Sequence, residues 1–131
     1  MLAKEKKGIQ LNEKTKILEL FDNQNGHRNY RIIHTAHEFT SVCPKTGHPD
    51  FATMTFEYIP EKYCVELKSL KLYLQSFRND GIFYENVTNR IADDLIGMLQ
   101  PRYFKLTANF SVRGGVSSVV VVEHKAKGFA E

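Results

Sequence analysis

This chain of 131 residues has only two cysteines, no tryptophan and no apolar run long enough to span a bilayer. The segment Met1–Lys7 is charged and no apolar region follows it, so we expect no secretory signal. Two cysteines without such a signal favour a reducing cytoplasm and free thiols over a disulfide framework, although the spacing leaves a Cys43–Cys64 bridge open.

Several binding motifs are also missing. No G-x-G-x-x-G sequence follows a strand, which argues against a dinucleotide site of the Rossmann type. The five histidines do not show the paired spacing of a structural zinc site, so we predict no metal ligands: His27, His34, His37, His48 and His124. The formal net charge of +3 is too small to indicate nucleic acid, and it suits an anionic small ligand equally well.

The patterning that is present predicts one domain of the α+β class. Residues 1–27 are polar and read as a loosely held N-terminal arm, with a short ordered segment near residues 17–21. Residues 28–124 form the domain and 125–131 a tail. Alternating or continuously apolar runs predict four strands, at residues 28–35, 52–59, 103–112 and 116–122. Apolar stripes at helical spacing predict two helices, one from Leu67 to the stop signal Asn79-Asp80-Gly81 and one over residues 85–99.

The resulting order is ββααββ. Gly114-Gly115 predicts a tight hairpin between the last two strands, and residues 37–47 read as a loop after the first. Strand pairs linked as hairpins form antiparallel sheets, so we expect a four-stranded antiparallel sheet with two helices on one face. The first helix is expected to bury a stripe that starts at Leu67 and ends at Phe77.

Residues 43–73 hold most of the candidate chemistry. Cys43 lies in a predicted loop near Lys45 and His48, where cations favour the reactive thiolate; the alternative is a small buried apolar side chain. Asp50 lies between Pro49 and Phe51, a setting that suits a proton donor, although aspartate is commoner as a turn or capping residue.

Two glutamates and three basic residues accompany this pair. Glu66 and Glu85 precede or open the helices, where a carboxylate caps the helix or accepts two hydrogen bonds from a guanine-like edge. Lys68, Lys71 and Arg78 share one helical face, which is either a solvated surface or a phosphate site for a dinucleotide.

These residues resemble the NADPH-dependent 7-cyano-7-deazaguanine reductases, the nitrile reductases of queuosine biosynthesis. The resemblance covers about residues 38–118, and the eight-residue signature Glu66–Tyr73 with the Cys/Asp loop is its most specific part. The matching segments are Cys43–Gly47, Pro49–Thr53, Glu66–Tyr73, Ser76–Asn79 and Arg113–Gly115.

The resemblance implies the tunnelling fold of the GTP cyclohydrolase I-like superfamily, in a short single-domain form, whose subunits join edge to edge into homo-oligomeric rings. It also implies roles for individual residues. Cys43 would form a covalent thioimidate and Asp50 would supply protons. The deazaguanine would be held by Glu66 and Glu85 with the backbone at Val65 and Leu67, and NADPH by Lys68, Lys71 and Arg113.

One position departs from the family pattern. The family has His-Glu where this chain has Tyr84-Glu85, so we expect Tyr84 to serve the substrate through its hydroxyl or its ring, without acting as an acid or base. Two other functions remain open. One is an amidine-forming transferase of the same fold that acts on the same nitrile, and the other is a non-enzymatic ring protein that binds purines or pterins.

Overall fold

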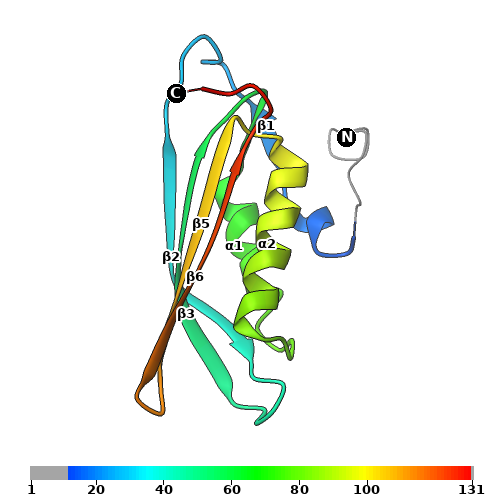
Figure 1. The fold of residues 1–131 in the computed structure, drawn as a ribbon. Coiled ribbons are helices and arrows are strands. Elements are labelled where there is room, and N and C mark those ends of the chain that lie inside the picture. Colours follow the sequence, from blue (N-terminus) through cyan, green and yellow to red (C-terminus); the bar gives the residue numbers. More distant parts are fainter. Residues whose placement is uncertain (1–11, 131) are drawn as a thin grey trace.

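A four-stranded antiparallel sheet with two helices on one face forms the body of the molecule (Figure 1). The computed structural model describes residues 12–130. A 3-10 turn at Thr15–Ile17 precedes these elements: β1 (Leu20–Asp22), β2 (Ile32–Val42), β3 (Pro49–Ile59), β4 (Tyr63–Val65), α1 (Leu67–Gln75), α2 (Tyr84–Leu99), β5 (Tyr103–Arg113) and β6 (Val116–Lys125). The predicted α+β class and the ββααββ body are confirmed, with two short strands added.

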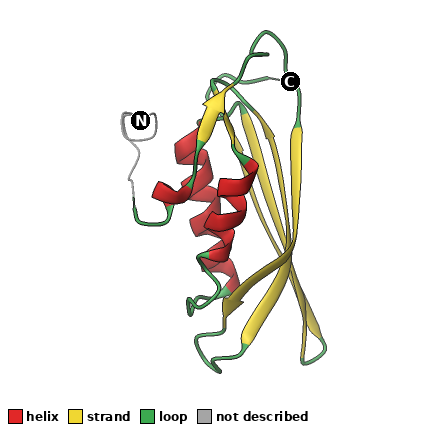
Figure 2. Cartoon of the chain, turned by 180° about the vertical axis from the view of Figure 1, so that it is seen from behind, coloured by secondary structure: helices red, strands yellow, loops and turns green. Residues whose placement is uncertain are grey.

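The sheet has the strand order β2-β3-β5-β6. Two hairpins, β2–β3 and β5–β6, meet where β3 pairs with β5, and both helices lie in the connection between these two central strands. The helices cover the same face of the sheet, as the view from behind shows (Figure 2). The added strands β1 and β4 pair with each other beside the main sheet.

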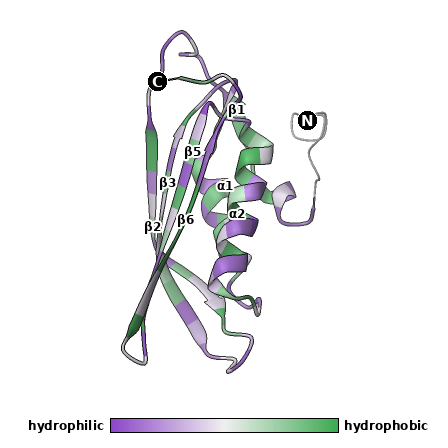
Figure 3. Cartoon of the chain, viewed as in Figure 1, coloured by the Kyte–Doolittle hydropathy of each residue, from purple (hydrophilic) through white to green (hydrophobic). Residues whose placement is uncertain are grey.

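The core lies between the sheet and the helices. Ala52, Met54, Phe56 and Tyr58 of β3 are all at most 3% exposed, because alternate residues of a strand face the same side. The predicted stripe of α2, from Val87 to Met98, is buried against them. Hydropathy therefore changes along each strand and helix, as one-sided burial requires (Figure 3).

The first long strand differs from its prediction at both ends. β2 covers Ile32–Val42, whereas strand 28–35 and a loop over 37–47 were expected. A bulge between Ala36 and Phe39 adds a residue and shifts the inward-facing set, so that Phe39 and Ser41 face the core. Because of this shift, inward-facing and outward-facing residues do not alternate regularly along the sequence of β2. Only a short turn then separates Cys43 from Asp50.

The N-terminal segment also differs from the expected loose arm. Thr15 and Leu18 are 1% and 2% exposed, and β1 pairs with β4 in register from Leu20 to Asp22. The Lys14 ammonium lies 2.9 Å from the Asp80 carboxylate, beyond the end of α1. Residues 12–22 are therefore packed onto the domain, while the part of the predicted arm before residue 12 lies outside the described residues.

The predicted stripe of α1 is buried at Leu70, Leu74 and Phe77 but not at its first residue. Leu67 is 59% exposed, whereas Leu70, Tyr73 and Leu74 are buried. Leu67 is the first helical residue, where the chain has just left β4 and its side chain does not yet face the sheet. At the other end of the chain β6 continues to Lys125, three residues beyond the predicted strand. Within the described residues the helices are too short or too polar to cross a membrane.

Candidate functional site

A tight turn joins β2 to β3 and places Cys43 beside Asp50. The Cys43 N–H donates to the His48 carbonyl at 2.9 Å, and the Gly47 N–H donates to the Cys43 carbonyl at 2.8 Å. Gly47 has a φ of 76°, a conformation that glycine adopts without steric cost. Asp50 lies two residues into β3, so the predicted nucleophile and acid share one end of the hairpin.

The turn also stabilises the thiolate of Cys43. The Thr46 hydroxyl and the backbone N–H groups of Thr46 and Lys45 lower the pKa of the Cys43 thiol, because each donates a hydrogen bond to the charged sulfur. Partial burial and the charge of Asp50 act in the opposite direction. Since the thiolate is the nucleophilic form, this turn prepares Cys43 for attack on an electrophilic carbon.

Asp50 is 5% exposed and has two side-chain partners. Arg113, at the end of β5, lies 3.1 Å from Asp50 Oδ1 and also donates to the Pro49 carbonyl. The Tyr84 hydroxyl lies 3.4 Å from the same carboxylate oxygen. The family resemblance implies a cofactor role for Arg113, whereas in the structure its guanidinium contacts the predicted acid.

Tyr84 is the first residue of α2 and lies flat on Phe110, with ring centroids 3.8 Å apart and planes 9° from parallel. Burial, and then the charge of Asp50, raise the pKa of the Tyr84 phenol, so it stays a neutral donor near pH 7. Phe110 was not predicted to be a neighbour of the site. The sequence indicated only that Phe110 is the last inward-facing aromatic residue of β5, and the structure places it directly opposite Ala52 of β3.

The start of α1 forms a second group of predicted site residues. Both oxygens of Glu66 cap the helix, since Oε2 accepts from the Lys68 N–H at 2.9 Å and Oε1 from the Ser69 N–H at 2.8 Å. These two backbone bonds lower the pKa of Glu66. Val65 is fixed by a hydrogen bond from its N–H to the Tyr58 hydroxyl at 3.1 Å. The capping role considered for Glu66 is thus present, and each oxygen retains a lone pair for a ligand.

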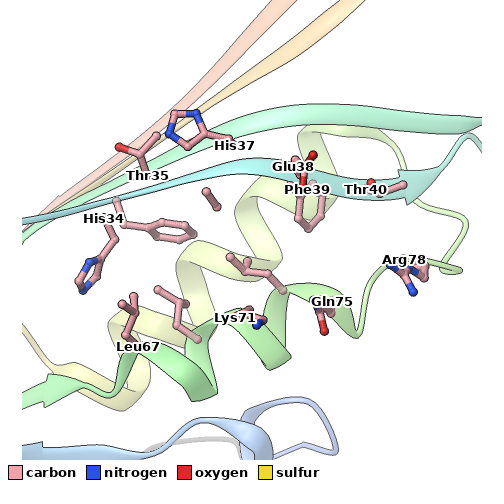
Figure 4. Close-up of a pocket in the computed structure, with 14 residues that line it drawn as sticks. His34, Thr35, His37, Glu38, Phe39, Thr40, Leu67, Lys71, Gln75 and Arg78 are labelled. Atoms are coloured by element: carbon pink, nitrogen blue, oxygen red, sulfur yellow. The ribbon is translucent and has the colours of Figure 1, made fainter.

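A pocket of about 380 Å³ lies between α1 and strand β2 (Figure 4). Lys71, Gln75 and Arg78 line it from the helix side, and the bulged segment of β2 lines the other wall. Both cationic side chains are exposed. A pocket with two cations beside an outer strand suits a phosphate-bearing ligand.

The predicted site residues therefore fall into two groups in one chain. Cys43, Asp50, Tyr84 and Arg113 gather where β2, β3 and β5 meet the start of α2, and Glu85 lies in the same first turn of α2. Glu66, Leu67, Lys68 and Lys71 lie on the first half of α1. The nine residues of α1 span about 13 Å. In Figure 1 the start of α1 lies toward the β1 end of the molecule and the start of α2 toward the opposite end.

The second cysteine lies outside this chemistry, whereas two of the histidines, His34 and His37, line the pocket beside β2. Both Cys43 and Cys64 are free thiols, so the disulfide that the spacing left open does not form. Cys64 is buried in β4, and burial raises the pKa of its thiol. Among residues 12–130 the structure contains no group of three or more His, Cys, Asp or Glu arranged to hold a metal ion.

Comparison with known proteins identifies the family. Residues 49–128 match the family model described as QueF-like protein. The chain is 56% identical over 115 residues to the NADPH-dependent 7-cyano-7-deazaguanine reductase of Chlorobium phaeovibrioides, covering 88% of this chain and 99% of that protein. It is 58% identical over 114 residues to the reductase of Nitrosospira multiformis, covering 87% of this chain and 82% of that protein. The chain belongs to this family.

A solved structure supports the fold of this QueF-like chain. The archaeosine synthase QueF-Like, in its apo form, superposes with a TM-score of 0.64 at 25% sequence identity, over 78% of this chain and 96% of that one. The predicted tunnelling fold and the resemblance to the reductases are thereby confirmed. The reductases are more than twice as similar in sequence to this chain as the synthase is.

Proposed function

We propose that this chain reduces the nitrile of 7-cyano-7-deazaguanine to the aminomethyl group, with NADPH as the reductant, in the cytoplasm and within queuosine biosynthesis. Each turnover takes up two hydrides and two protons, so one nitrile and two NADPH give one amine and two NADP⁺. The observation that carries the proposal is the Cys43 turn, which stabilises a thiolate beside a buried carboxyl group. The family supplies the substrate and the reductant.

Cys43 and Asp50 perform the first step. The Cys43 sulfur forms a bond to the nitrile carbon, one π bond of the nitrile breaks, and its electron pair goes to the nitrogen. Asp50 gives that nitrogen a proton, and the product is a thioimidate. Asp50 is buried and lies near enough to Cys43 for its charge to raise the pKa of the thiol, which suits a general acid that must serve one atom of a bound substrate.

The deazaguanine is held by the carboxylates and by backbone groups of the two helix starts. Glu85 lies exposed in the first turn of α2 and accepts from the ring N–H and the exocyclic amine. Glu66 contributes through its remaining lone pairs, together with the backbone at Val65 and Leu67. Tyr84 covers the site with its ring, which Phe110 supports.

When bound, NADPH would supply a hydride to the carbon at each reduction. The chain fits this cofactor because Lys68 and Lys71 are exposed on one face of α1, and Lys71 lines the pocket together with Arg78. These cations hold the phosphates. Arg113 contacts Asp50 in the ligand-free protein, so a cofactor role for Arg113 would require this ion pair to open.

Two copies of the chain are needed for one site. The catalytic group at the start of α2 and the cofactor group on α1 lie toward opposite ends of the helical layer, so one chain does not surround one substrate with both. The outer strands β2 and β6 each pair with a neighbouring strand on one side only. Their other edges are therefore available to pair with the sheet of a second copy. A homo-oligomeric ring, without a nucleic acid or membrane partner, brings the groups together.

The amidine-forming transferase is the second candidate because the solved neighbour is an archaeosine synthase. It would use Cys43 on the same nitrile but would transfer nitrogen to the thioimidate carbon in place of hydride. The reductase signature on α1 and the higher identity to the reductases favour reduction. A ring protein that only binds purines or pterins has no use for the stabilised thiolate of Cys43.

Loss of NADPH absorbance separates the three functions. With 7-cyano-7-deazaguanine, we expect the wild-type chain to oxidise two NADPH for each nitrile consumed, and Cys43→Ala to oxidise none. Cys64→Ala is the matched control and should keep its activity, because that buried thiol lies outside the site. Amidine formed from ammonia without NADPH consumption would support the transferase, and unchanged nitrile would support the binding protein.

A further inference from the structure

Ser41 carries the one buried side-chain oxygen that has no hydrogen-bond partner among residues 12–130. Its side chain is 0% exposed, so solvent does not supply a partner. A buried hydroxyl without a partner loses its hydrogen bonds to water and gains nothing in return, which makes it costly to keep. Other buried hydroxyls in the described chain are bonded: Thr15 to Asn12, Ser69 to Glu66 and Thr88 to Tyr84.

The sheet places this hydroxyl opposite Asp50. Ser41 and Asp50 are direct partners in the β2–β3 ladder, and both are buried on the helix side. Directly opposed residues on one face of an antiparallel pair have Cβ atoms about 5 Å apart. One rotamer change of either short side chain is enough to bring a hydroxyl and a carboxyl oxygen within hydrogen-bond distance.

The partners of Asp50 leave room for such a bond. Both contacts recorded for the carboxylate, from Arg113 and from the Tyr84 hydroxyl, go to Oδ1. Within the described residues no donor is recorded on Oδ2. The carboxylate thus has an unused oxygen, and the residue facing it across the ladder has an unused hydroxyl.

We propose that Ser41 is a positioning residue that donates its hydroxyl hydrogen bond to Asp50 as Asp50 delivers its proton. The inference rests on the proposed nitrile reduction. Ser41 donates to Oδ2, and Oδ1 delivers the proton to the nitrile nitrogen once bound substrate has displaced the contacts from Arg113 and Tyr84. Once the proton has left, the carboxylate is charged and the same bond strengthens, so Ser41 stabilises the transition state more than the ground state.

The bulge in β2 explains how Ser41 comes to lie there. Without the extra residue between Ala36 and Phe39, the inward set of β2 would continue at even-numbered positions, and Ser41 would face away from the helices. The bulge therefore sets both the inward hydroxyl and the position of Cys43 two residues later.

Ser41→Ala tests this role through two readouts that move in opposite directions. We expect kcat to fall about tenfold or more, the effect of one hydrogen bond to a charged group, with KM for the nitrile within twofold of wild type. The melting temperature of the ligand-free protein should stay equal or rise, because the variant buries no unpaired hydroxyl. In an Asp50→Asn background the same change should cost no further activity.

Thr15→Val is the matched control, since it deletes a buried hydroxyl that is bonded to Asn12 far from Cys43 in the sequence. It should lower the melting temperature and leave kcat unchanged. A kcat of Ser41→Ala within twofold of wild type would overturn the proposal, as would a clear fall in its melting temperature. Ser41→Cys, which keeps the size and donates poorly, gives a second test if the alanine variant does not fold. A wild-type chain without nitrile-dependent NADPH oxidation would instead refute the proposed function.

Discussion

At the residue scale, the turn around Cys43 sets the pH at which the thiol reacts. The Thr46 hydroxyl is the largest of the contributions that lower the pKa of Cys43. Thr46→Val keeps the shape of the side chain and removes that donor, so the pKa of Cys43 should rise. The thiolate is the form that reacts with iodoacetamide, so the alkylation rate increases as the thiol ionises. The midpoint of this increase should lie at a higher pH in the variant than in wild type.

This alkylation is best measured in a Cys64→Ala background, which leaves Cys43 as the one cysteine of the chain. Lys45→Ala is a useful comparison, because Lys45 acts on the sulfur through its backbone N–H, which the substitution retains. Identical pH profiles for Thr46→Val and its parent would show that the hydroxyl does not stabilise the thiolate.

Tyr84 is the residue at which we expect this chain to depart from the family pattern. Tyr84→Phe keeps the stacking on Phe110 and removes the hydroxyl that lies 3.4 Å from Asp50. We expect kcat to fall about fivefold, the effect of one net hydrogen bond, while the Cys43 adduct still forms. An intact-mass measurement with the nitrile and no NADPH checks the adduct. A loss confined to KM would assign the hydroxyl to the substrate and not to Asp50.

The sequence was sufficient to predict Cys43 and Asp50 as a pair, because only six residues, which include a turn, separate them. It was not sufficient for Ser41, Phe110 or the contact between Arg113 and Asp50. Arg113 lies 63 residues after Asp50, and only the pairing of β3 with β5 brings the ends of these strands together. Ser41 depends on a bulge that breaks the alternation on which strand prediction relies.

At the scale of elements, α1 and the turn that follows it present two cations to the pocket, Lys71 and Arg78. Lys71→Ala removes one of them, and we expect KM for NADPH to rise about tenfold, with a smaller change in KM for the nitrile. The effect should shrink with added salt, because exposed charges are screened. Lys62→Ala, an exposed cation away from the pocket lining, should change neither constant. Equal changes in both constants for Lys71→Ala would contradict a cofactor role.

The elements themselves were predictable where one periodicity runs without interruption. Helix α2 and strands β3 and β5 have regular apolar stripes, and their predicted bounds differ from the structure by at most three residues. A short ordered segment near residues 17–21 was expected, but its pairing with β4 was not. Thr15 is buried through side-chain bonds to Asn12, and Leu18 through packing that no local pattern encodes.

At the scale of the whole molecule, both the separation of the two groups of site residues and the unpaired edges of the two outer strands favour a site shared between two copies of the chain. The cofactor group on α1 and the catalytic group around Cys43 lie toward opposite ends of the helical layer, and the pocket opens beside the outer strand β2. The Val42–Gly81 bridge occupies only the last residue of that edge. A head-to-tail ring of copies would place the catalytic group of one chain against the cofactor group of the next.

Complementation between two inactive variants tests this account most directly. One variant carries Cys43→Ala and the other Lys68→Ala with Lys71→Ala, with NADPH kept below the KM of the second. In oligomers that contain equal amounts of both variants, half of the catalytic groups and half of the cofactor groups are intact. Random assembly should therefore restore activity in about a quarter of the sites, those in which two intact groups meet at an interface. A mixture of Cys43→Ala with Asp50→Asn, which damages the same group twice, should stay inactive. If the first mixture also stays inactive while both variants co-assemble, the site lies within one chain and the account is wrong.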